Sequence, residues 1–185
     1  MKKLIISLTV LFVAIGAMAD VDIAIGSKPF NMSITPDVAI YGQSVLIKGM
    51  TLSLWGENEQ DSLALGIVNG SSGFSSGVDW AFALNYADNF TGVKWAVVNH
   101  NTGNTVGWDA GFLNYSSGAM KGVYTGIVNY VGRLKGVQFG LFNYVETGDS
   151  GVQIGLINII DNNDEWFSDM PNQLAPWTLF VNWRF

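Results

Sequence analysis

Hydrophobic and polar residues alternate with a period of two along most of the chain, and the alternation follows a repeated unit. Each unit reads Gly-Val-x-x-Gly/Ala, then two apolar residues, Asn and often Tyr. A short segment rich in Gly, Ser, Asn and Thr separates it from the next. A period of two predicts β-strands rather than helices, and the polar segments predict turns. We therefore expect an all-β protein in which each unit supplies one strand and one turn.

An asparagine closes each copy of the unit. Successive asparagines are 16, 14, 15, 15, 14 and 15 residues apart, a regularity that indicates a true internal repeat. Two interpretations of these residues remain open: a turn-former that bonds its own backbone, or a ladder of stacked Asn side chains inside a solenoid. The seven positions are Asn69, Asn85, Asn99, Asn114, Asn129, Asn143 and Asn158.

A glycine also recurs inside the expected strands, at Gly111, Gly126, Gly140 and Gly155. Glycine weakens the interior of a strand, so its recurrence requires a steric reason. We attribute it to the inner wall of a narrow closed barrel, where there is no room for bulk.

The two faces of each expected strand differ in character. In the copy that starts at Gly136, Phe139 and Leu141 lie on an apolar face and Gln138 lies on the other. We expect the apolar face to point outward. Lys94 and Asp109 occupy the same polar position in neighbouring copies. If that position faces the interior, the two residues can pair there.

The last strand presents a continuous apolar face made of Leu179, Val181, Trp183 and the terminal Phe185. This face resembles the carboxy-terminal signature of bacterial outer-membrane β-barrels, which the assembly machinery of that membrane reads. A sheet in hydrocarbon must close so that every backbone group is paired. Ten residues of tilted strand cover about 23 Å, close to the ~25 Å apolar band of such barrels. We therefore predict one domain over residues 20–185, an outer-membrane type, antiparallel up-and-down β-barrel of about ten strands, with eight or twelve also possible.

The alternative is a β-solenoid of 14–16-residue repeats. Seven rungs spaced at ~4.8 Å would form a rod of about 34 Å. Parallel, in-register pairing of Asn99, Asn114 and Asn129 would favour the solenoid, and antiparallel pairing would exclude it.

The first nineteen residues have the pattern of a secretory signal peptide. Lys2 and Lys3 precede an apolar run over residues 4–15, and Ala17-Met18-Ala19 is a small-x-small cleavage site. We therefore expect an exported protein whose mature chain begins at Asp20.

The composition excludes several classes of protein and site. Of 185 residues, 49% are hydrophobic and 13% are charged, which excludes a disordered chain. Zero Cys and a single His exclude a disulfide framework and a multi-His metal site. A net charge of −6 argues against a nucleic-acid partner.

No catalytic, cofactor or metal site is predicted, and we expect the chain not to be an enzyme. His100 reads as a turn residue without a nucleophile beside it. The long segment 161–176 holds four acidic residues whose spacing fits no calcium loop, so we expect a solvated loop. These acidic residues are Asp161, Asp164, Glu165 and Asp169.

The units VQIGLIN, VQFGLFNY and VYTGIVNY resemble those of a family of exported bacterial surface-repeat proteins, as do PFNMSITPDVAIYG ahead of them and the closing FVNWRF. The resemblance covers residues 28–185 and implies a surface or outer-membrane setting, with no assigned activity. We expect an integral outer-membrane barrel with a structural or interaction role, whose partners are outer-membrane lipid and the barrel-assembly machinery. The alternative is a soluble exported solenoid that acts as a scaffold or adhesin.

Overall fold

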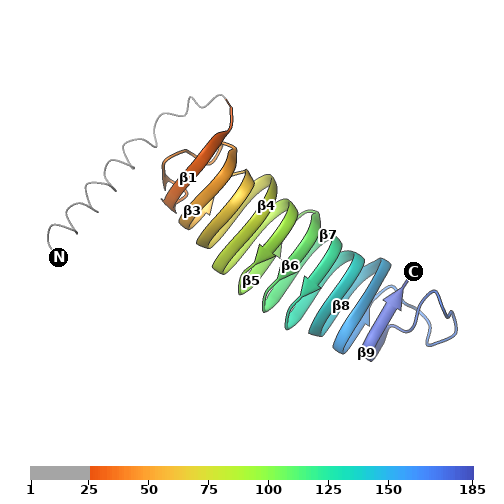
Figure 1. Cartoon of the computed structure of the whole chain (residues 1–185). Coiled ribbons are helices and arrows are strands. Elements are labelled where there is room, and N and C mark those ends of the chain that lie inside the picture. The colour runs from red at the N-terminus through yellow and green to blue at the C-terminus, as the bar shows by residue number, and fades with distance from the viewer. Residues whose placement is uncertain (1–25) are drawn as a thin grey trace, which may run out of the picture.

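The computed structural model describes residues 26–185, and all regular secondary structure in this part of the chain is β-strand (Figure 1). The two longest strands, β4 and β8, each contain more than one copy of the repeat. The strands are β1 (Lys28–Thr35), β2 (Val38–Ala39), β3 (Ile47–Glu57), β4 (Gln60–Trp95), β5 (Val98–Asn101), β6 (Thr105–Ala110), β7 (Leu113–Thr125), β8 (Val128–Ile160) and β9 (Trp177–Arg184).

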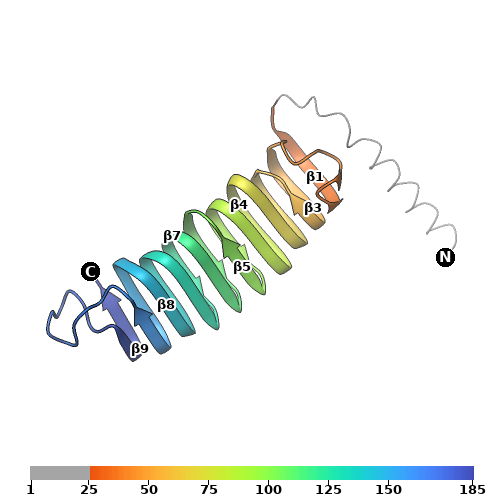
Figure 2. The same ribbon diagram turned by 180° about the vertical axis from the view of Figure 1, so that it is seen from behind.

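Successive copies of the repeat pair in parallel and in register. Asn85 lies opposite Asn99, Asn99 opposite Asn114, and Asn114 opposite Asn129. Because paired residues are one repeat apart, the chain makes one full coil per repeat. Figures 1 and 2 show these coils stacked into a straight rod. The fold is a β-solenoid, which confirms the alternative and the all-β class.

The prediction of an antiparallel β-barrel over residues 20–185 is wrong. Alternation with a period of two is common to both architectures, so it does not choose between them. In an up-and-down barrel, equivalent residues of successive strands lie at opposite ends and cannot touch. In a coil they lie directly above one another, where identical amide side chains bond to each other. The predicted signal peptide, residues 1–19, lies outside the described residues.

The outward direction of the apolar face is as predicted. Gln138 is fully buried, whereas Phe139 and Leu141 are exposed. The interior changes in character along the rod. Small polar side chains such as Ser71 and Ser75 fill the earlier coils. Apolar side chains form one buried cluster in the later coils: Met120, Tyr124, Val131, Leu134, Val145 and Ile160.

The two ends of the rod differ. At the first end, β1 pairs in parallel with β3 and antiparallel with the short β2. At the other end, β9 runs antiparallel to the last coil of β8, with Gly155 opposite Phe180. The segment 161–176 loops out between them (Figure 2). β9 therefore pairs the edge of the last coil and ends the parallel stack.

Candidate functional site

One side of the rod, which we call the apolar face, consists of outward positions in each copy of the repeat. These positions lie between the glycine that starts the copy and the residue after the repeat asparagine. We call the starting glycines the corner glycines: Gly77, Gly92, Gly107, Gly122, Gly136 and Gly151. In the copies from Gly77 onward these positions carry no charged side chain. Phe82, on β4, and Phe112, in the bend between β6 and β7, are 67% and 64% exposed. Further exposed members are Val78, Trp80, Val93, Trp95, Val97, Trp108, Leu113, Ile127, Val128, Phe139, Leu141, Phe142, Ile154 and Leu156.

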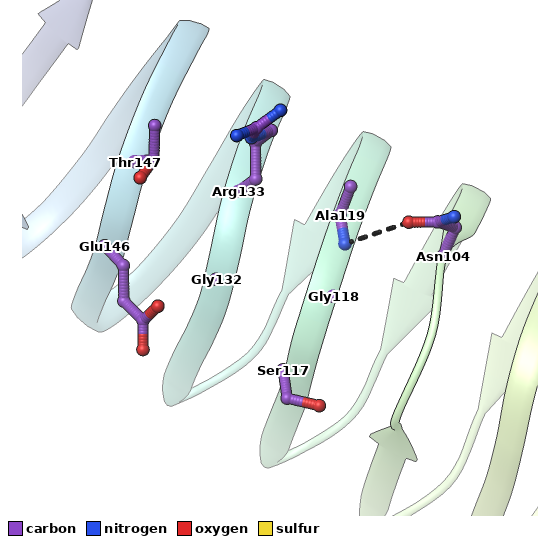
Figure 3. Close-up of a pocket in the computed structure, with 8 residues that line it drawn as sticks. All are labelled: Asn104, Ser117, Gly118, Ala119, Gly132, Arg133, Glu146 and Thr147. Atoms are coloured by element: carbon purple, nitrogen blue, oxygen red, sulfur yellow. Dashed lines mark hydrogen bonds between the residues drawn. The ribbon is translucent and has the colours of Figure 1, made fainter.

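The opposite side, which we call the polar face, carries the charges and the small turn residues. It holds a shallow hollow of about 350 Å³ (Figure 3). Its lining residues come from successive coils, and Asn104 Oδ1 accepts a hydrogen bond from the Ala119 backbone N–H at 3.3 Å. The lining is Asn104, Ser117, Gly118, Ala119, Gly132, Arg133, Glu146 and Thr147. Because the lining mixes small side chains with single charges of each sign, it favours no particular ligand.

Aromatic side chains stack from coil to coil on the outside of the rod. The rings of Trp80 and Trp95 are parallel, with centroids 5.4 Å apart. A second stack runs from His100 through Tyr115 and Tyr130 to Tyr144, with centroids 4.8–5.3 Å apart. The prediction that His100 is a turn residue is therefore wrong. It lies in β5, and its ring begins the second stack.

The repeat asparagines form the ladder that the solenoid interpretation describes. In each step Nδ2 donates to Oδ1 of the Asn in the next coil, at 2.8–3.3 Å from Asn69 through Asn158. Several of the Nδ2 groups also donate to a backbone carbonyl, as Asn99 does to Ala110 at 2.9 Å. All seven side chains are buried. The ladder therefore satisfies buried polar groups that no solvent reaches.

The recurrent glycines lie where one coil passes close to the previous one. A Cβ at Gly126 would lie 2.6 Å from the carbonyl oxygen of Gly111, and one at Gly140 would lie 2.7 Å from that of Gly126. Gly111 and Gly155 face the preceding coil in the same way. The close approach of stacked coils explains the glycines, and the proposed narrow barrel wall does not.

The predicted membrane-assembly signature lies on β9, except for Phe185, which follows the end of the strand. Leu179, Val181 and Phe185 are exposed, and Trp183 donates from Nε1 to the carbonyl of Pro171 at 2.9 Å. Three of these side chains therefore remain available on the surface at the end of the stack. Recognition by the assembly machinery stays a prediction.

Side-chain contacts connect residues of the acidic loop to one another and to β9. The Asp169 carboxylate accepts from Asn172 at 3.0 Å, and Arg184 lies 4.0 Å from Asp164. Trp166 and Trp177 meet edge to face at 5.3 Å. Among residues 26–185, no group of three or more His, Cys, Asp or Glu side chains is placed to hold a metal ion.

A charged cluster occupies the interior of the middle coils. Lys94 Nζ lies 3.4 Å from Asp109 Oδ2, so the predicted pairing of these residues is confirmed. Lys94 also donates to Asn101 Oδ1, and Asn101 Nδ2 donates to Asp109 Oδ2 at 2.9 Å. Asp79 occupies the same inward position in the preceding coil and accepts from Gln60 at 3.1 Å. All four residues of the cluster are buried.

Burial shifts the protonation of this cluster away from its charged forms. Desolvation lowers the pKa of the Lys94 ammonium, although Asp109 and Asp79 oppose the shift. Desolvation likewise raises the pKa of the Asp109 carboxyl despite the nearby Lys94. It raises the pKa of Asp79 to about 7, again against the charge of Lys94. Burial therefore disfavours the charged form of each of these three groups.

Sequence reasoning identified Lys94 and Asp109 but missed Asn101 and Asp79. The signal for Asn101 was its place two residues after a repeat asparagine. Equivalent positions hold Ser71, Ala87, Ser116, Val131, Val145 and Ile160, all of them buried. The signal for Asp79 was its place two residues after a corner glycine, shared with Lys94 and Asp109.

Comparisons with known proteins add no family to this geometry. No family model, no curated protein and no solved structure matches the chain. The resemblance to exported surface-repeat proteins therefore stays a prediction. Within residues 26–185, no helix has the length and apolar character needed to cross a membrane.

Proposed function

We propose that this protein is an exported β-solenoid scaffold that attaches to a lipid surface through its apolar face and keeps its polar face in water. The observation that carries the proposal is the division of the rod into an uncharged apolar side and a charged side. Exposed apolar patches larger than a few hundred Å² mark protein or membrane interaction sites on soluble folds. The expectation that the chain has no catalytic activity stays a prediction.

The energetics favour attachment by burial of side chains. Full transfer of a Val, Leu or Phe side chain from water contributes about 1.5–3 kcal/mol. Phe82 and Phe112 project from coils that are separated by one intervening coil. The exposed Trp80 lies in the coil of Phe82, and the exposed Trp95 lies in the intervening coil. Partial insertion of a few such side chains is enough for reversible binding, in the way that amphipathic elements lie in the interface.

Because of the charge distribution, electrostatic attraction to lipid headgroups should contribute little to the binding free energy. The full chain carries a net charge of −6, and the exposed charges beyond Gly77 lie off the apolar face. Anionic lipids would repel such a protein rather than attract it. We therefore expect binding to neutral phosphatidylcholine vesicles that persists at high salt, since added salt screens only the electrostatic part.

Flotation with phosphatidylcholine vesicles tests the proposal. Wild-type protein is expected to float with the vesicles, and the double variant Phe82→Ser/Phe112→Ser is expected to bind at least about tenfold more weakly, because two exposed rings are lost. The matched control, Asn104→Ala/Ser117→Ala, changes two residues of the polar face and should float like the wild type. The blue shift of tryptophan emission provides a second readout of the same event.

Two results would overturn lipid attachment. One is wild-type protein that stays in the lipid-free fraction at every vesicle concentration. The other is a concentration-dependent dimer, measured by light scattering, that is lost in the same double variant without any vesicle binding. The second result would assign the apolar face to another copy of the chain.

Export and an outer-membrane or surface location are part of the same proposal. They are supported by the signal-peptide pattern of residues 1–19 and by the C-terminal resemblance, Leu179 to Phe185. Fractionation of the expressing cell tests them. Recovery of the full-length, uncleaved chain in the cytoplasm would contradict this location while leaving lipid attachment to be judged by flotation.

A further inference from the structure

We propose that Lys94 and Asn101 join through an intramolecular isopeptide bond that forms without any other protein, with Asp109 as the catalytic residue. The product is an amide between Lys94 Nζ and Asn101 Cγ, and the by-product is ammonia. The inference does not depend on lipid attachment, because all of its groups lie inside the rod.

The geometry places nucleophile, electrophile and proton carrier together. Lys94 on β4 and Asn101 on β5 lie in the same coil and meet across its interior, where Nζ is hydrogen-bonded to the side-chain carbonyl that it would attack. Asp109 Oδ2 is 3.4 Å from Nζ and 2.9 Å from Nδ2, the leaving nitrogen. A single carboxyl oxygen therefore touches both nitrogens between which a proton has to move.

The surroundings exclude water and favour an amine nucleophile. Lys94, Asn101 and Asp109 are fully buried, and the Phe90 ring centroid lies 4.6 Å from Nζ. Burial lowers the pKa of Lys94 and raises that of Asp109, and both shifts act in the direction of proton transfer from the ammonium to the carboxylate. Exclusion of water also protects the amide from competing hydrolysis.

Lys94 is distinctive among the lysines that the structure describes. Lys48, Lys121 and Lys135 are exposed and Lys28 is half-buried, whereas Lys94 is fully buried. A buried charge pair stabilises a protein poorly, because desolvation offsets much of the attraction. Asp109 Oδ1 also has no hydrogen-bond partner. Conversion of the amine to an amide leaves no ammonium group to be charged in the interior, so the bond would remove this desolvation cost.

The reaction balances in atoms and electrons. The lone pair of the neutral Nζ forms a bond to Cγ of Asn101, and the π electrons of the carbonyl move to Oδ1, which takes the proton of the Asp109 carboxylic acid. The Asp109 carboxylate then removes a proton from Nζ and passes it to Nδ2. The Cγ–Nδ2 bond breaks, the carbonyl re-forms as its proton returns to Asp109, and ammonia leaves. No oxidation or reduction occurs, and Asp109 ends as it began.

Mass spectrometry of the purified, denatured wild-type protein tests the proposal. We expect an intact mass lower than that of the same chain without the bond by one molecule of ammonia. Trypsin should fail to cleave after Lys94 and should leave one peptide from Gly49 to Lys121, while cleavage after Lys121 proceeds normally. Fragmentation of that peptide should place the linkage between Lys94 and Asn101.

Two conservative variants test the role of Asp109. Asp109→Asn removes the proton carrier with little change in shape, and we expect the unmodified mass and normal cleavage after Lys94. The matched control Asp79→Asn changes the same inward position one coil earlier. The Asp79 side chain is hydrogen-bonded to Gln60 and to neither Lys94 nor Asn101, so we expect the isopeptide bond to form in this variant. A cross-link that persists in Asp109→Asn would overturn the role of that residue.

The wild-type measurement decides the main claim whether or not a variant folds. An unmodified wild-type mass with complete cleavage after Lys94 would overturn the bond. Loss of ammonia with normal cleavage after Lys94 would also overturn it, since the loss would then come from cyclisation at another asparagine, for example Asn69 before Gly70.

Discussion

The Asn114 side chain donates from Nδ2 to Oδ1 of Asn129 at 2.8 Å, although the two residues are fifteen positions apart in the chain. Both side chains are completely buried. The same bond recurs on either side, from Asn99 to Asn114 and from Asn129 to Asn143. The asparagine ladder therefore connects successive coils along the interior, and we expect the stability of the rod to depend on an unbroken ladder.

Interruption of the asparagine ladder should destabilise the protein. In Asn114→Ala, Oδ1 of Asn129 and the carbonyl of Thr125 lose a donor, and Asn99 loses an acceptor. An unsatisfied buried polar group costs about 1–3 kcal/mol, so we expect a loss of about 2–4 kcal/mol in the free energy of unfolding. Urea denaturation followed by circular dichroism measures it.

The exposed Asn104 provides the comparison for that variant. Asn104→Ala removes one hydrogen bond on the polar face and should lower stability by less than about 1 kcal/mol. An equal loss in the free energy of unfolding for the two substitutions would show that the buried asparagine ladder stabilises the protein no more than an exposed hydrogen bond does.

The corner glycines should be intolerant of any side chain. Gly122 has a φ of +144°, and a Cβ there would collide with the carbonyl of Gly107 in the preceding coil. We expect Gly122→Ala to cost more than about 2 kcal/mol, because backbone strain and the displaced coil add together. Thermal unfolding measures the loss.

Gly148 is the matched glycine for this test. Its φ is not in the left-handed region, and the atoms nearest to a Cβ there would be side-chain atoms of Ile160 and Arg184, the first at 3.1 Å. Gly148→Ala should therefore change stability by less than about 1 kcal/mol. A Gly122 variant as stable as the Gly148 variant would contradict the close approach of the coils.

Stability should fall as pH rises through the range in which Asp79 loses its proton. Burial raises the pKa of Asp79 from 3.8 to about 7, so the unfolded chain releases this proton first. The stabilising contribution of the protonated form is complete below about pH 4 and is lost between pH 4 and 7. Three pKa units correspond to at most about 4 kcal/mol.

The comparison with Asp79→Asn isolates this effect from other carboxylates. Unfolding midpoints measured from pH 4 to 8 should show that the variant becomes progressively more stable relative to the wild type as pH rises. A constant difference between the two proteins over this range would mean that Asp79 is ionised throughout in the folded state.

Removal of β9 should cause the chain to form end-to-end assemblies. A chain that stops after Pro176 leaves the backbone groups of Gly151–Ile159 without the pairing that β9 supplies. Exposed edge strands recruit other strands, and repeat proteins need terminal caps for the same reason. Light scattering should show oligomers that grow with concentration.

A substitution within β9 is the control for this truncation. Phe180 is 70% exposed and has a φ of 71°, a region unfavourable for a side chain. Phe180→Gly should keep the cap and should not form the oligomers expected of the truncated chain. Monomeric behaviour of the truncated chain would show that the last coil needs no cap.

The sequence determined the local structure of this protein and the direction of its faces. Strands with period-two alternation, the repeat of 14–16 residues, the exposed Phe139 and Leu141, and the pairing of Lys94 with Asp109 all follow from residue order. The strands, the repeat and the direction of the faces depend on the order of residues along each copy, and both architectures preserve them. The contact between Lys94 and Asp109 also needs equivalent positions of successive copies to lie side by side, which the parallel coils provide.

Only the tertiary structure decided between a barrel and a coil. That choice depends on whether the chain reverses or continues in the same sense at each turn, and a Gly-rich turn permits either. Stacking in the same sense places Asn114 against Asn129, so that their side-chain amides form a hydrogen bond. It also places Gly122 against Gly107, whose carbonyl oxygen leaves no room for a Cβ. It also brings Asn101 to Lys94 across one coil, a contact that strand alternation by itself does not predict.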